Sequence, residues 1–261
     1  MRSDQWRNRG STEHGGVVEK DVHELNLHII CRVIRFDQFH IRATFCSEET
    51  QRAEMKTLVV GVGGMTNGGK STLSKSLHQL LPTSCLIAQD SYFKVELQED
   101  SVVPVDHNGF KQYDMLSALH MDTMMSDVHS WQRDPESFLR QRDLNPAETT
   151  PPDVYVLIVE GFLIFNHRPL NDLFDKRYFL EIPYDVCKRR RSSRVYTPPD
   201  PPGYFDGYVW PMYLKNRREM ESRVSGLVIL DGLQPKDEVL DAVWKDVCQE
   251  IERLEEKDRT R

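Results

Sequence analysis

The sequence predicts an α/β protein whose sheet is mainly parallel and flanked by helices. Three observations lead to this prediction. After residue 55, short apolar segments alternate with amphipathic segments, which is typical of strands that alternate with helices. A glycine-rich loop separates the first apolar segment from the first helical one. The 261 residues are 39% hydrophobic and 29% charged, a globular composition in a chain long enough to bury a sizeable core.

Five segments are predicted to be strands. The first is Thr57–Val62, which is apolar and followed by glycines, and the second is Ser84–Ala88. The third, Val154–Val159, reads VYVLIV and is almost wholly apolar. Such a run is expected of a strand that is buried on both faces of a parallel sheet. The remaining candidates are Arg177–Ile182 and Leu227–Leu230.

Three segments are predicted to be helices. Lys70–Leu81 is followed by Pro82, which cannot continue a helix, and Leu116–Trp131 has the apolar spacing of an amphipathic helix. Val239–Leu254 is predicted as a closing amphipathic helix. Residues 91–112 read as a polar loop. Residues 133–153, rich in Pro, Arg and Asp, read as a surface insertion.

The first 54 residues differ from the rest in composition and in the pattern of their apolar residues. Residues 1–16 are polar, and residues 25–45 show a partial apolar alternation that would suit strands. They contain no motif that points to a function. We therefore expect a poorly ordered N-terminal extension over 1–54 and one domain over 55–261.

Composition excludes several classes of protein. The net charge of −7 argues against a nucleic-acid-binding module. No apolar run approaches the ~20 residues that a membrane-spanning helix needs. The five cysteines are scattered without a CxxC pair, which argues against a disulfide framework and a cysteine zinc site. A reducing, cytoplasmic setting is therefore expected.

The most informative motif is a phosphate-binding loop. Residues Gly64–Ser71 read GMTNGGKS and match G-x-x-x-x-G-K-[ST] between a predicted strand and a predicted helix. Glycines let the backbone curl so that its N–H groups and the helix N-terminus bind an anion. Lys70 adds a positive charge for the phosphates, and Ser71 offers a hydroxyl to Mg²⁺. The dinucleotide-binding motif G-x-G-x-x-G is not matched, because Gly61–Thr66 has threonine in place of the third glycine. A nucleoside triphosphate is the expected ligand.

Two acidic residues follow predicted strands. Asp90 comes just after the second strand, where residues of a doubly wound sheet face the ligand crevice. A carboxylate there can accept a hydroxyl proton and contact Mg²⁺, although a plain helix cap is an equal alternative. Glu160 ends the apolar strand, where an unpaired buried charge would be costly, so a role with Mg²⁺ or the nucleophile is favoured over an exposed strand end.

A basic run covers residues 188–194. On a helix Arg190 and Arg194 share a face that Arg191 adjoins, and guanidinium groups on such a face can clamp phosphates. Taken alone, the run would more often be a solvated face or a nuclear-localisation-like signal. Neither the NKxD motif of GTPases nor an LSGGQ-like signature of ABC ATPases is present in the sequence.

These motifs, taken together, resemble one family. From Met55 to about Gly232 the chain resembles nicotinamide riboside kinases, within the uridine-kinase-like group of P-loop kinases. GGMTNGGK is especially similar to the second vertebrate form. The matching segments are GGMTNGGKSTL (63–73), QDSYFK (89–94), NGFKQYD (108–114), VEGFLIFN (159–166), IPYDVCKRRRSSRVY (182–196) and PPGYFDGYVWPMYLKNRREM (201–220).

The resemblance implies a P-loop NTPase fold with a small helical lid over about 186–206. It implies ATP and Mg²⁺ as cofactors, with Asp90 as general base on the riboside 5′-hydroxyl and Ser71 and Asp90 as metal ligands. Lys70, Asp90 and Glu160 form the implied catalytic set. The residues implied to bind ATP are Gly64, Met65, Thr66, Asn67, Gly68, Gly69, Lys70, Ser71, Thr72, Arg190, Ser192, Arg194, Val195, Tyr196, Gln234, Pro235 and Lys236.

The same resemblance implies an acceptor site. Tyr113 and Tyr196 would sandwich a pyridinium ring, which suits aromatic faces because the ring is cationic. Asp114 and Arg191 would bind the ribose hydroxyls, and Asp200 would contact the base. The full set implied to bind the acceptor is Asp90, Ser91, Tyr92, Phe93, Tyr113, Asp114, Arg191, Tyr196, Thr197 and Asp200.

The sequence departs from the family in three places. QDSYFKV stands where the family often has QDDFFKP, so Ser91 replaces the second acid and Val95 the proline. The insertion over 133–153 has no assigned function, and the extension over 1–54 lies outside the family pattern. The implied reaction is phosphorylation of nicotinamide riboside, and of nicotinic acid riboside, in NAD biosynthesis. Two alternatives stay open: a pyrimidine nucleoside kinase, and a silent binding protein of the same fold. The protein is expected to be a monomer or a weak homo-oligomer, without nucleic-acid or membrane partners.

Overall fold

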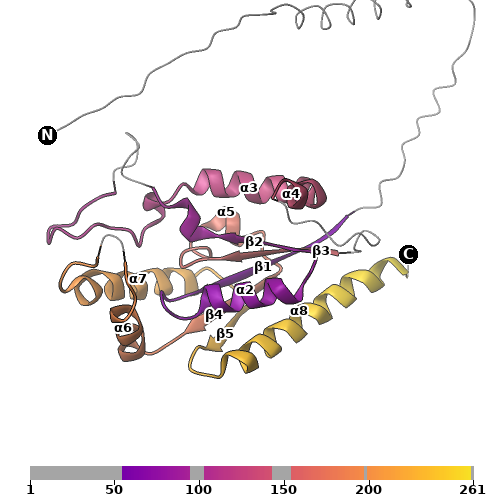
Figure 1. Ribbon diagram of the computed structural model, residues 1–261. Helices are drawn as coiled ribbons and strands as arrows, with labels where there is room; N and C mark the ends of the chain where they lie inside the picture. Colours follow the sequence, from indigo (N-terminus) through magenta and orange to yellow (C-terminus); the bar gives the residue numbers. More distant parts are fainter. Residues whose placement is uncertain (1–54, 95–102, 143–153, 197–198, 260–261) are drawn as a thin grey trace, which may run out of the picture. The chain divides into compact units, whose positions relative to one another are not determined.

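A computed structural model describes residues 55–94, 103–142, 154–196 and 199–259 (Figure 1). The extension predicted over 1–54 and the second part of the predicted insertion, 143–153, lie outside the described residues, as does Thr197.

The centre of the fold is a parallel sheet of five strands in the order β2-β3-β1-β4-β5. Each of the five predicted strands is present, with ends within two residues of those predicted. The strands are β1 (Lys56–Gly64), β2 (Ser84–Ala88), β3 (Val154–Glu160), β4 (Lys176–Glu181) and β5 (Leu227–Asp231). The α/β prediction with a mainly parallel sheet is therefore confirmed.

The register of this sheet brings three strand ends together. Glu160, at the end of β3, lies opposite Val62 of β1 on one side and Ala88 of β2 on the other. The glycine-rich loop after β1 and the turn after β2 therefore start beside Glu160. This is the edge where ligands bind in open parallel sheets.

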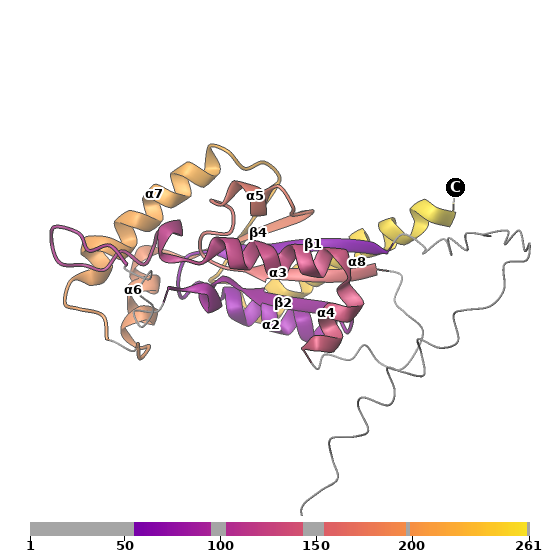
Figure 2. The same cartoon turned by 90° about the horizontal axis from the view of Figure 1, so that it is seen from above.

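Helices cover both faces of the sheet. The 3₁₀ turns are η1 (Gln89–Tyr92) and η2 (Leu116–Ala118), and the π-helical turn is η3 (Phe205–Val209). The α-helices are α2 (Lys70–Leu80), α3 (Met121–Arg133), α4 (Pro135–Gln141), α5 (Arg168–Asn171), α6 (Tyr184–Ser192), α7 (Trp210–Glu221) and α8 (Lys236–Arg259). In Figure 1, α3, α4 and α5 lie above the sheet and α2 and α8 lie below it. Figure 2 shows α6 and α7 together at one end of the sheet.

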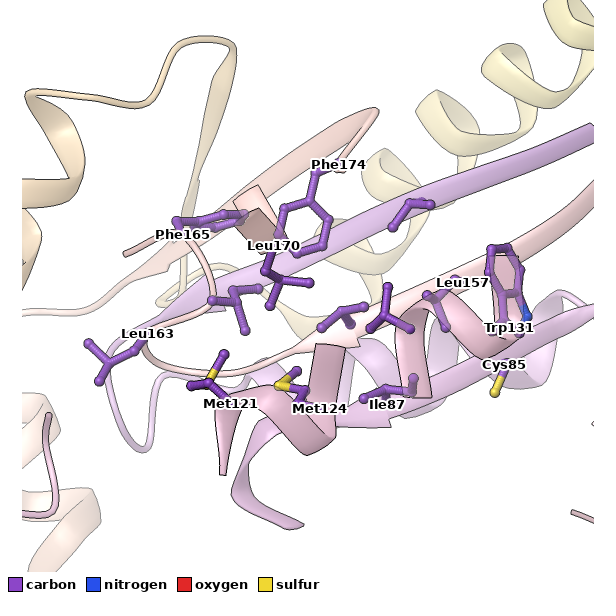
Figure 3. Close-up of a cluster of buried hydrophobic side chains, with 14 of the residues drawn as sticks. Cys85, Ile87, Met121, Met124, Trp131, Leu157, Leu163, Phe165, Leu170 and Phe174 are labelled. Atoms are coloured by element: carbon purple, nitrogen blue, oxygen red, sulfur yellow. The ribbon is translucent and has the colours of Figure 1, made fainter. Parts of the chain in front are cut away.

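Each face has its own core. Above the sheet, Trp131 and Met124 of α3 pack with Leu157 of β3 and with Phe165 and Phe174 (Figure 3). Below it, apolar side chains of α2 and α8 pack against β1, β3 and β4. Full burial of a large apolar side chain contributes roughly 1.5–3 kcal/mol. These two cores fix the strands whose ends carry the site.

The segment predicted as one helix, Leu116–Trp131, is divided in the structure. A single 3₁₀ turn, η2, comes first, and α3 begins only at Met121. Leu119 between them is extended and pairs with Phe93 in an antiparallel bridge. Pairing with a distant segment therefore overrides the local apolar spacing, which predicted a continuous helix.

The first part of the predicted surface insertion belongs to the core. Asp134 caps α4 by accepting the backbone N–H of Ser137, and Pro135 stands at the first helical position. Phe138 and Leu139 of this helix are buried in the upper core. The prediction of a surface insertion is therefore wrong for residues 133–142, because they include a short helix whose apolar side is buried while its charged residues cap it or lie on its outer side.

A third core lies beneath the glycine-rich loop. It joins Met65 of the loop to Cys187 of α6 and to Tyr204, Phe205 and Tyr208 around η3. The range predicted for the lid thus begins within α6 and reaches the start of η3. The helix α7 that follows was not predicted from the apolar pattern.

Within the described ranges, no helix is both long and apolar enough to cross a membrane.

Candidate active site

The glycine-rich loop has the backbone that its motif requires. Gly64 has φ 135°, and a Cβ there would lie 2.4 Å from the carbonyl oxygen of Leu180, so only glycine fits. The N–H of Gly68 donates to Met65 O at 3.0 Å, and Asn67 has φ 58°. The loop therefore curls tightly before α2 begins at Lys70.

Lys70 is buried beneath this loop. Its side chain is 9% exposed, and its Nζ donates to the carbonyl oxygen of Met65 at 3.1 Å. Burial lowers the pKa of Lys70, while the nearby carboxylates of Glu160 and Asp90 act to raise it. The ammonium group is thus held between the loop and two acids, which is where it can neutralise a phosphate.

Glu160 is a buried acid with polar partners. It is 5% exposed, and its Oε1 accepts a hydrogen bond from Ser71 Oγ at 2.8 Å. Burial raises the pKa of Glu160, opposed by Lys70 and by the hydroxyl of Ser71. This burial rules out the alternative of an exposed strand-end glutamate.

Asp90 lies on the exposed side of the turn after β2. The N-terminal cap of η1 is Ala88, so Asp90 is not the capping residue that the alternative required. Its charge raises the pKa of both Glu160 and Asp114. We call the glycine-rich loop, Glu160 and Asp90 together the phosphate side of the site.

A second group of residues forms what we call the acceptor side: Tyr113, Asp114, Arg191, Tyr196 and Asp200. Burial raises the pKa of Asp114 to about 7, opposed by Arg191, while Asp200 and Asp90 raise it further. Arg191 donates two hydrogen bonds to Asp200, at 2.6 and 3.0 Å. The acceptor side is thus a cluster of carboxylates around one guanidinium group.

The two tyrosines have different surroundings. Tyr113 contacts Phe93 edge to face, with ring centroids 5.9 Å apart, and Phe93 stacks on Phe162 at 5.6 Å. Tyr196 lies near the glycine-rich loop, because its hydroxyl and the Asn67 side chain are 3.3 Å apart. The guanidinium of Arg191 lies 4.5 Å from the centre of the Tyr196 ring. The ring of Tyr196 therefore already faces a cation.

A small pocket lies next to the acceptor side. It is bounded by the start of the glycine-rich loop, by Asp114 and Phe162, and by residues of α7 that the sequence analysis did not single out. Among these, Asn216 Nδ2 donates to the carbonyl oxygen of Asp114 at 3.0 Å. The only signal for α7 was its place in the segment 201–220 that resembles the family.

Of the remaining residues predicted to bind ATP, some contact the glycine-rich loop and others do not. Arg190 reaches the glycine-rich loop, donating to Asn67 O at 3.3 Å and to Gly232 O at 3.2 Å. The hydroxyl of Ser192 instead donates to Arg189 O within α6, and Val195 is 91% exposed. Residues 234–236 are exposed at the start of α8.

The residues after Asp90 point in different directions. Ser91 is exposed beside it, whereas Phe93 packs against Phe162. The hydroxyl of Tyr92 donates to Asp127 of α3 at 2.6 Å, and burial together with Asp127 raises the pKa of Tyr92. Tyr92 therefore faces α3, although the family resemblance implied that it binds the acceptor.

Comparison with known proteins assigns this arrangement to a family. Nicotinamide riboside kinase 1 from Rattus norvegicus is 51% identical over 199 residues, covering 76% of this chain and 98% of the relative. Nicotinamide riboside kinase 2 from Mus musculus is 48% identical over 190 residues, covering 73% and 95%. The chain belongs to the nicotinamide riboside kinase family. It is therefore a kinase, a phosphotransferase with an alcohol as acceptor.

The other comparisons are weaker than this family match. A uridine kinase from Leuconostoc citreum is 30% identical over 153 residues, covering 69% of that relative. Identities to the two forms of nicotinamide riboside kinase are similar, so they do not single out the second form that GGMTNGGK resembles. No protein-family model matches the sequence.

Among solved structures, a putative fructose transport system kinase from Silicibacter sp. TM1040 has a TM-score of 0.44 at 19% identity, covering 68% of this chain and 91% of that one. A possible uridine kinase from Bacillus stearothermophilus has a TM-score of 0.40 at 15% identity, covering 66% and 89%. Scores this low add nothing to what the strand order establishes.

Proposed function

We propose that this kinase transfers the γ-phosphoryl group of ATP to the 5′-hydroxyl of nicotinamide riboside. The products are ADP and nicotinamide mononucleotide, a step of NAD biosynthesis. One observation carries the proposal: Lys70, the Ser71–Glu160 pair and Asp90 lie together at the ends of adjacent strands, beside a tightly curled glycine-rich loop.

The proposed chemistry uses charge and position rather than a covalent intermediate. The 5′-oxygen forms a bond to the γ-phosphorus while the bond from that phosphorus to the β–γ bridging oxygen breaks. Asp90 accepts the hydroxyl proton, a role that its exposure at the strand edge and its nearness to Lys70 support. Lys70 neutralises the negative charge on the phosphates.

The residues of the phosphate side fit Mg²⁺. The hydroxyl of Ser71 and the carboxylate of Asp90 would bind it, with Glu160 hydrogen-bonded to Ser71, because Mg²⁺ prefers hard oxygen ligands. In the described part of the chain, no cluster of three or more His, Cys, Asp or Glu side chains could hold an ion alone. Mg²⁺ in kinases is bound by few protein oxygens together with phosphates and water. When bound, it neutralises charge on the β- and γ-phosphates.

The acceptor side supports a cationic riboside. Nicotinamide riboside carries a positive pyridinium ring, and the acceptor side offers it the carboxylates of Asp114 and Asp200, with Asp90 close enough to raise the pKa of Asp114. Tyr113 and Tyr196 offer aromatic faces, which attract a cation. A neutral pyrimidine nucleoside would gain neither interaction. Nicotinic acid riboside shares the pyridinium ring and is proposed as a second acceptor.

The proposal is tested by one assay on a panel of acceptors. Release of the nucleoside diphosphate, ADP from ATP or GDP from GTP, is measured with each donor and with nicotinamide riboside, nicotinic acid riboside, uridine or cytidine as acceptor. We expect the highest kcat/KM for the two pyridinium ribosides with ATP. A preference for uridine or cytidine would replace the proposal with a pyrimidine nucleoside kinase, and no turnover with any acceptor would favour the silent binding protein.

A further inference from the structure

The turn that carries Asp90 is held at both ends by side chains that do not face the acceptor. Gln89, before Asp90, is fully buried, and Tyr92, two residues after it, is half-buried. Asp90 and Ser91 between them are exposed. A four-residue 3₁₀ turn has little internal support, so its position depends on these two ends.

Gln89 fixes the first end against the segment after β3. Its Oε1 accepts the backbone N–H of Leu163 at 2.9 Å. A Cβ on Gly161 would lie only 2.5 Å from Gln89 Cβ, so the two segments are in close contact. Because Gly161 directly follows Glu160, this contact sets the spacing between Asp90 and Glu160.

Tyr92 fixes the second end against α3. Its carbonyl oxygen accepts the N–H of His120 at 2.8 Å, and its hydroxyl donates to Asp127 Oδ2 at 2.6 Å. The same carboxylate oxygen accepts a hydrogen bond from Arg142 at 3.2 Å. Arg142 in turn lies over the ring of Phe138 at 4.1 Å. Asp127 therefore joins the turn after β2 to α3 and, through Arg142, to α4.

We infer that Asp127 and Tyr92 are positioning residues for phosphoryl transfer, which hold Asp90 at the reacting hydroxyl through the hydrogen bond between their side chains. This inference rests on the proposed role of Asp90. Displacing a group by about 1 Å can cost on the order of a hundredfold in rate, so loss of one anchor of a short turn should reduce kcat. ATP affinity should not change, since the turn lies outside the glycine-rich loop.

The chain offers a matched control. Tyr178 of β4 is also buried and also donates its hydroxyl to a carboxylate, that of Asp246 on α8. This pair lies below the sheet and has no contact with the turn that carries Asp90. Tyr178→Phe therefore removes the same kind of hydrogen bond without affecting that turn.

The experiment compares full-length variants by kcat, KM for each substrate, calorimetric Kd for ATP and Tm. We expect Tyr92→Phe and Asp127→Leu each to lower kcat about three- to tenfold, with the Kd for ATP within about twofold of the parent. Asp127→Asn keeps an oxygen that accepts from Tyr92 and should retain kcat within about twofold of the parent. Tyr178→Phe should lower Tm but leave kcat unchanged.

A second comparison separates positioning from general stability. In a chain that carries Asp90→Asn, adding Tyr92→Phe should have no further effect on kcat, because the group that Tyr92 positions has already been removed. If Asp127→Leu fails to fold, Tyr92→Phe carries the test alone. The inference is overturned if Tyr92→Phe matches Tyr178→Phe in kcat, or lowers kcat equally with and without Asp90.

If the proposed function were wrong, the same experiments would give a different result from a failure of the positioning role. The parent chain would then not phosphorylate nicotinamide riboside, or Asp90→Asn would keep its activity. The positioning role would fall with it. An active parent, an inactive Asp90→Asn and an unaffected Tyr92→Phe would instead overturn the positioning role alone.

Discussion

The phosphate side and the acceptor side of the site are stabilised by different interactions. The phosphate side uses backbone curvature, strand ends and a buried Lys70 between two acids. The acceptor side is built from side chains of separate segments, joined by the Arg191–Asp200 ion pair and by aromatic contacts. Changes on the phosphate side should therefore act on kcat, and changes on the acceptor side on riboside affinity and selectivity.

The largest effect is expected on the phosphate side. Asp90→Asn removes the group proposed to accept the hydroxyl proton, and general-base catalysis typically contributes 10²–10⁴-fold. We expect kcat to fall by at least about a hundredfold while the calorimetric Kd for ATP stays close to that of the parent. Turnover within about threefold of the parent would show that Asp90 is not the base.

The next effect concerns the ion pair of the acceptor side. Asp200→Asn leaves one side-chain oxygen to accept from Arg191, so one of the two hydrogen bonds at 2.6 and 3.0 Å is lost and the other loses its charged acceptor. Hydrogen bonds to charged groups contribute about 1.5–3 kcal/mol, which corresponds to a rise of roughly 10- to 100-fold in KM for the riboside. KM for ATP serves as the internal control. A similar rise for both substrates would mean that the two sides are not independent.

Asp114 predicts a pH dependence of acceptor binding. Its pKa is raised to about 7, so its ionised fraction increases through neutral pH. An ionised carboxylate attracts a cationic riboside, so kcat/KM for nicotinamide riboside should rise about tenfold between pH 6 and pH 8. Asp114→Asn should flatten this rise. A profile that is unchanged in Asp114→Asn would assign the titration to another group.

The same shift has a consequence for stability. The folded-state pKa of Asp114 is above the ordinary 3.8, so the folded chain holds a proton that the unfolded chain releases. The contribution of this group to the free energy of unfolding is therefore present at low pH and is lost as pH rises toward 7. Asp114→Asn should accordingly raise Tm more at pH 8 than at pH 5.

A smaller effect is expected from Tyr196. Tyr196→Leu keeps apolar bulk but removes the aromatic face, and a cation–π contact contributes ~0.5–2 kcal/mol. We expect kcat/KM to fall roughly 3- to 30-fold more for nicotinamide riboside than for uridine. Tyr113→Leu should behave alike if both faces are used. Equal losses for the charged and the neutral nucleoside would show that the tyrosines contribute only apolar contact and no cation–π selectivity.

The smallest effect is expected from the extension. Both sides of the site lie within 64–236, and we propose that residues 55–261 form the kinase domain. A chain that starts at Met55 should fold and keep its kcat/KM within about twofold of the parent, since no proposed site residue is removed. Insolubility or loss of activity would show that residues 1–54 contribute to the core.

The five strands and the glycine-rich loop could be predicted because their signals are local. A strand buried on both faces is recognised from its apolar run, and the phosphate-binding loop from the spacing of its glycines and lysine. Each pattern is complete within about ten residues. The same is true of Glu160 and Asp90, since a residue at the end of a parallel strand must lie at the ligand edge. For this reason the phosphate side was largely accessible from sequence.

Long-range contacts decided the rest. Leu119 is extended because it pairs with Phe93, so α3 begins only at Met121. The apolar spacing had predicted a helix from Leu116. Tyr92 donates a hydrogen bond to Asp127, which lies 35 residues later in the chain. Asp114 is buried next to Arg191 and Asp200, which are also distant in sequence, and this burial raises its pKa. Periodicity reports only which side of an element is apolar, whereas these contacts depend on which elements meet. That information exists only once the sheet and its two cores have formed.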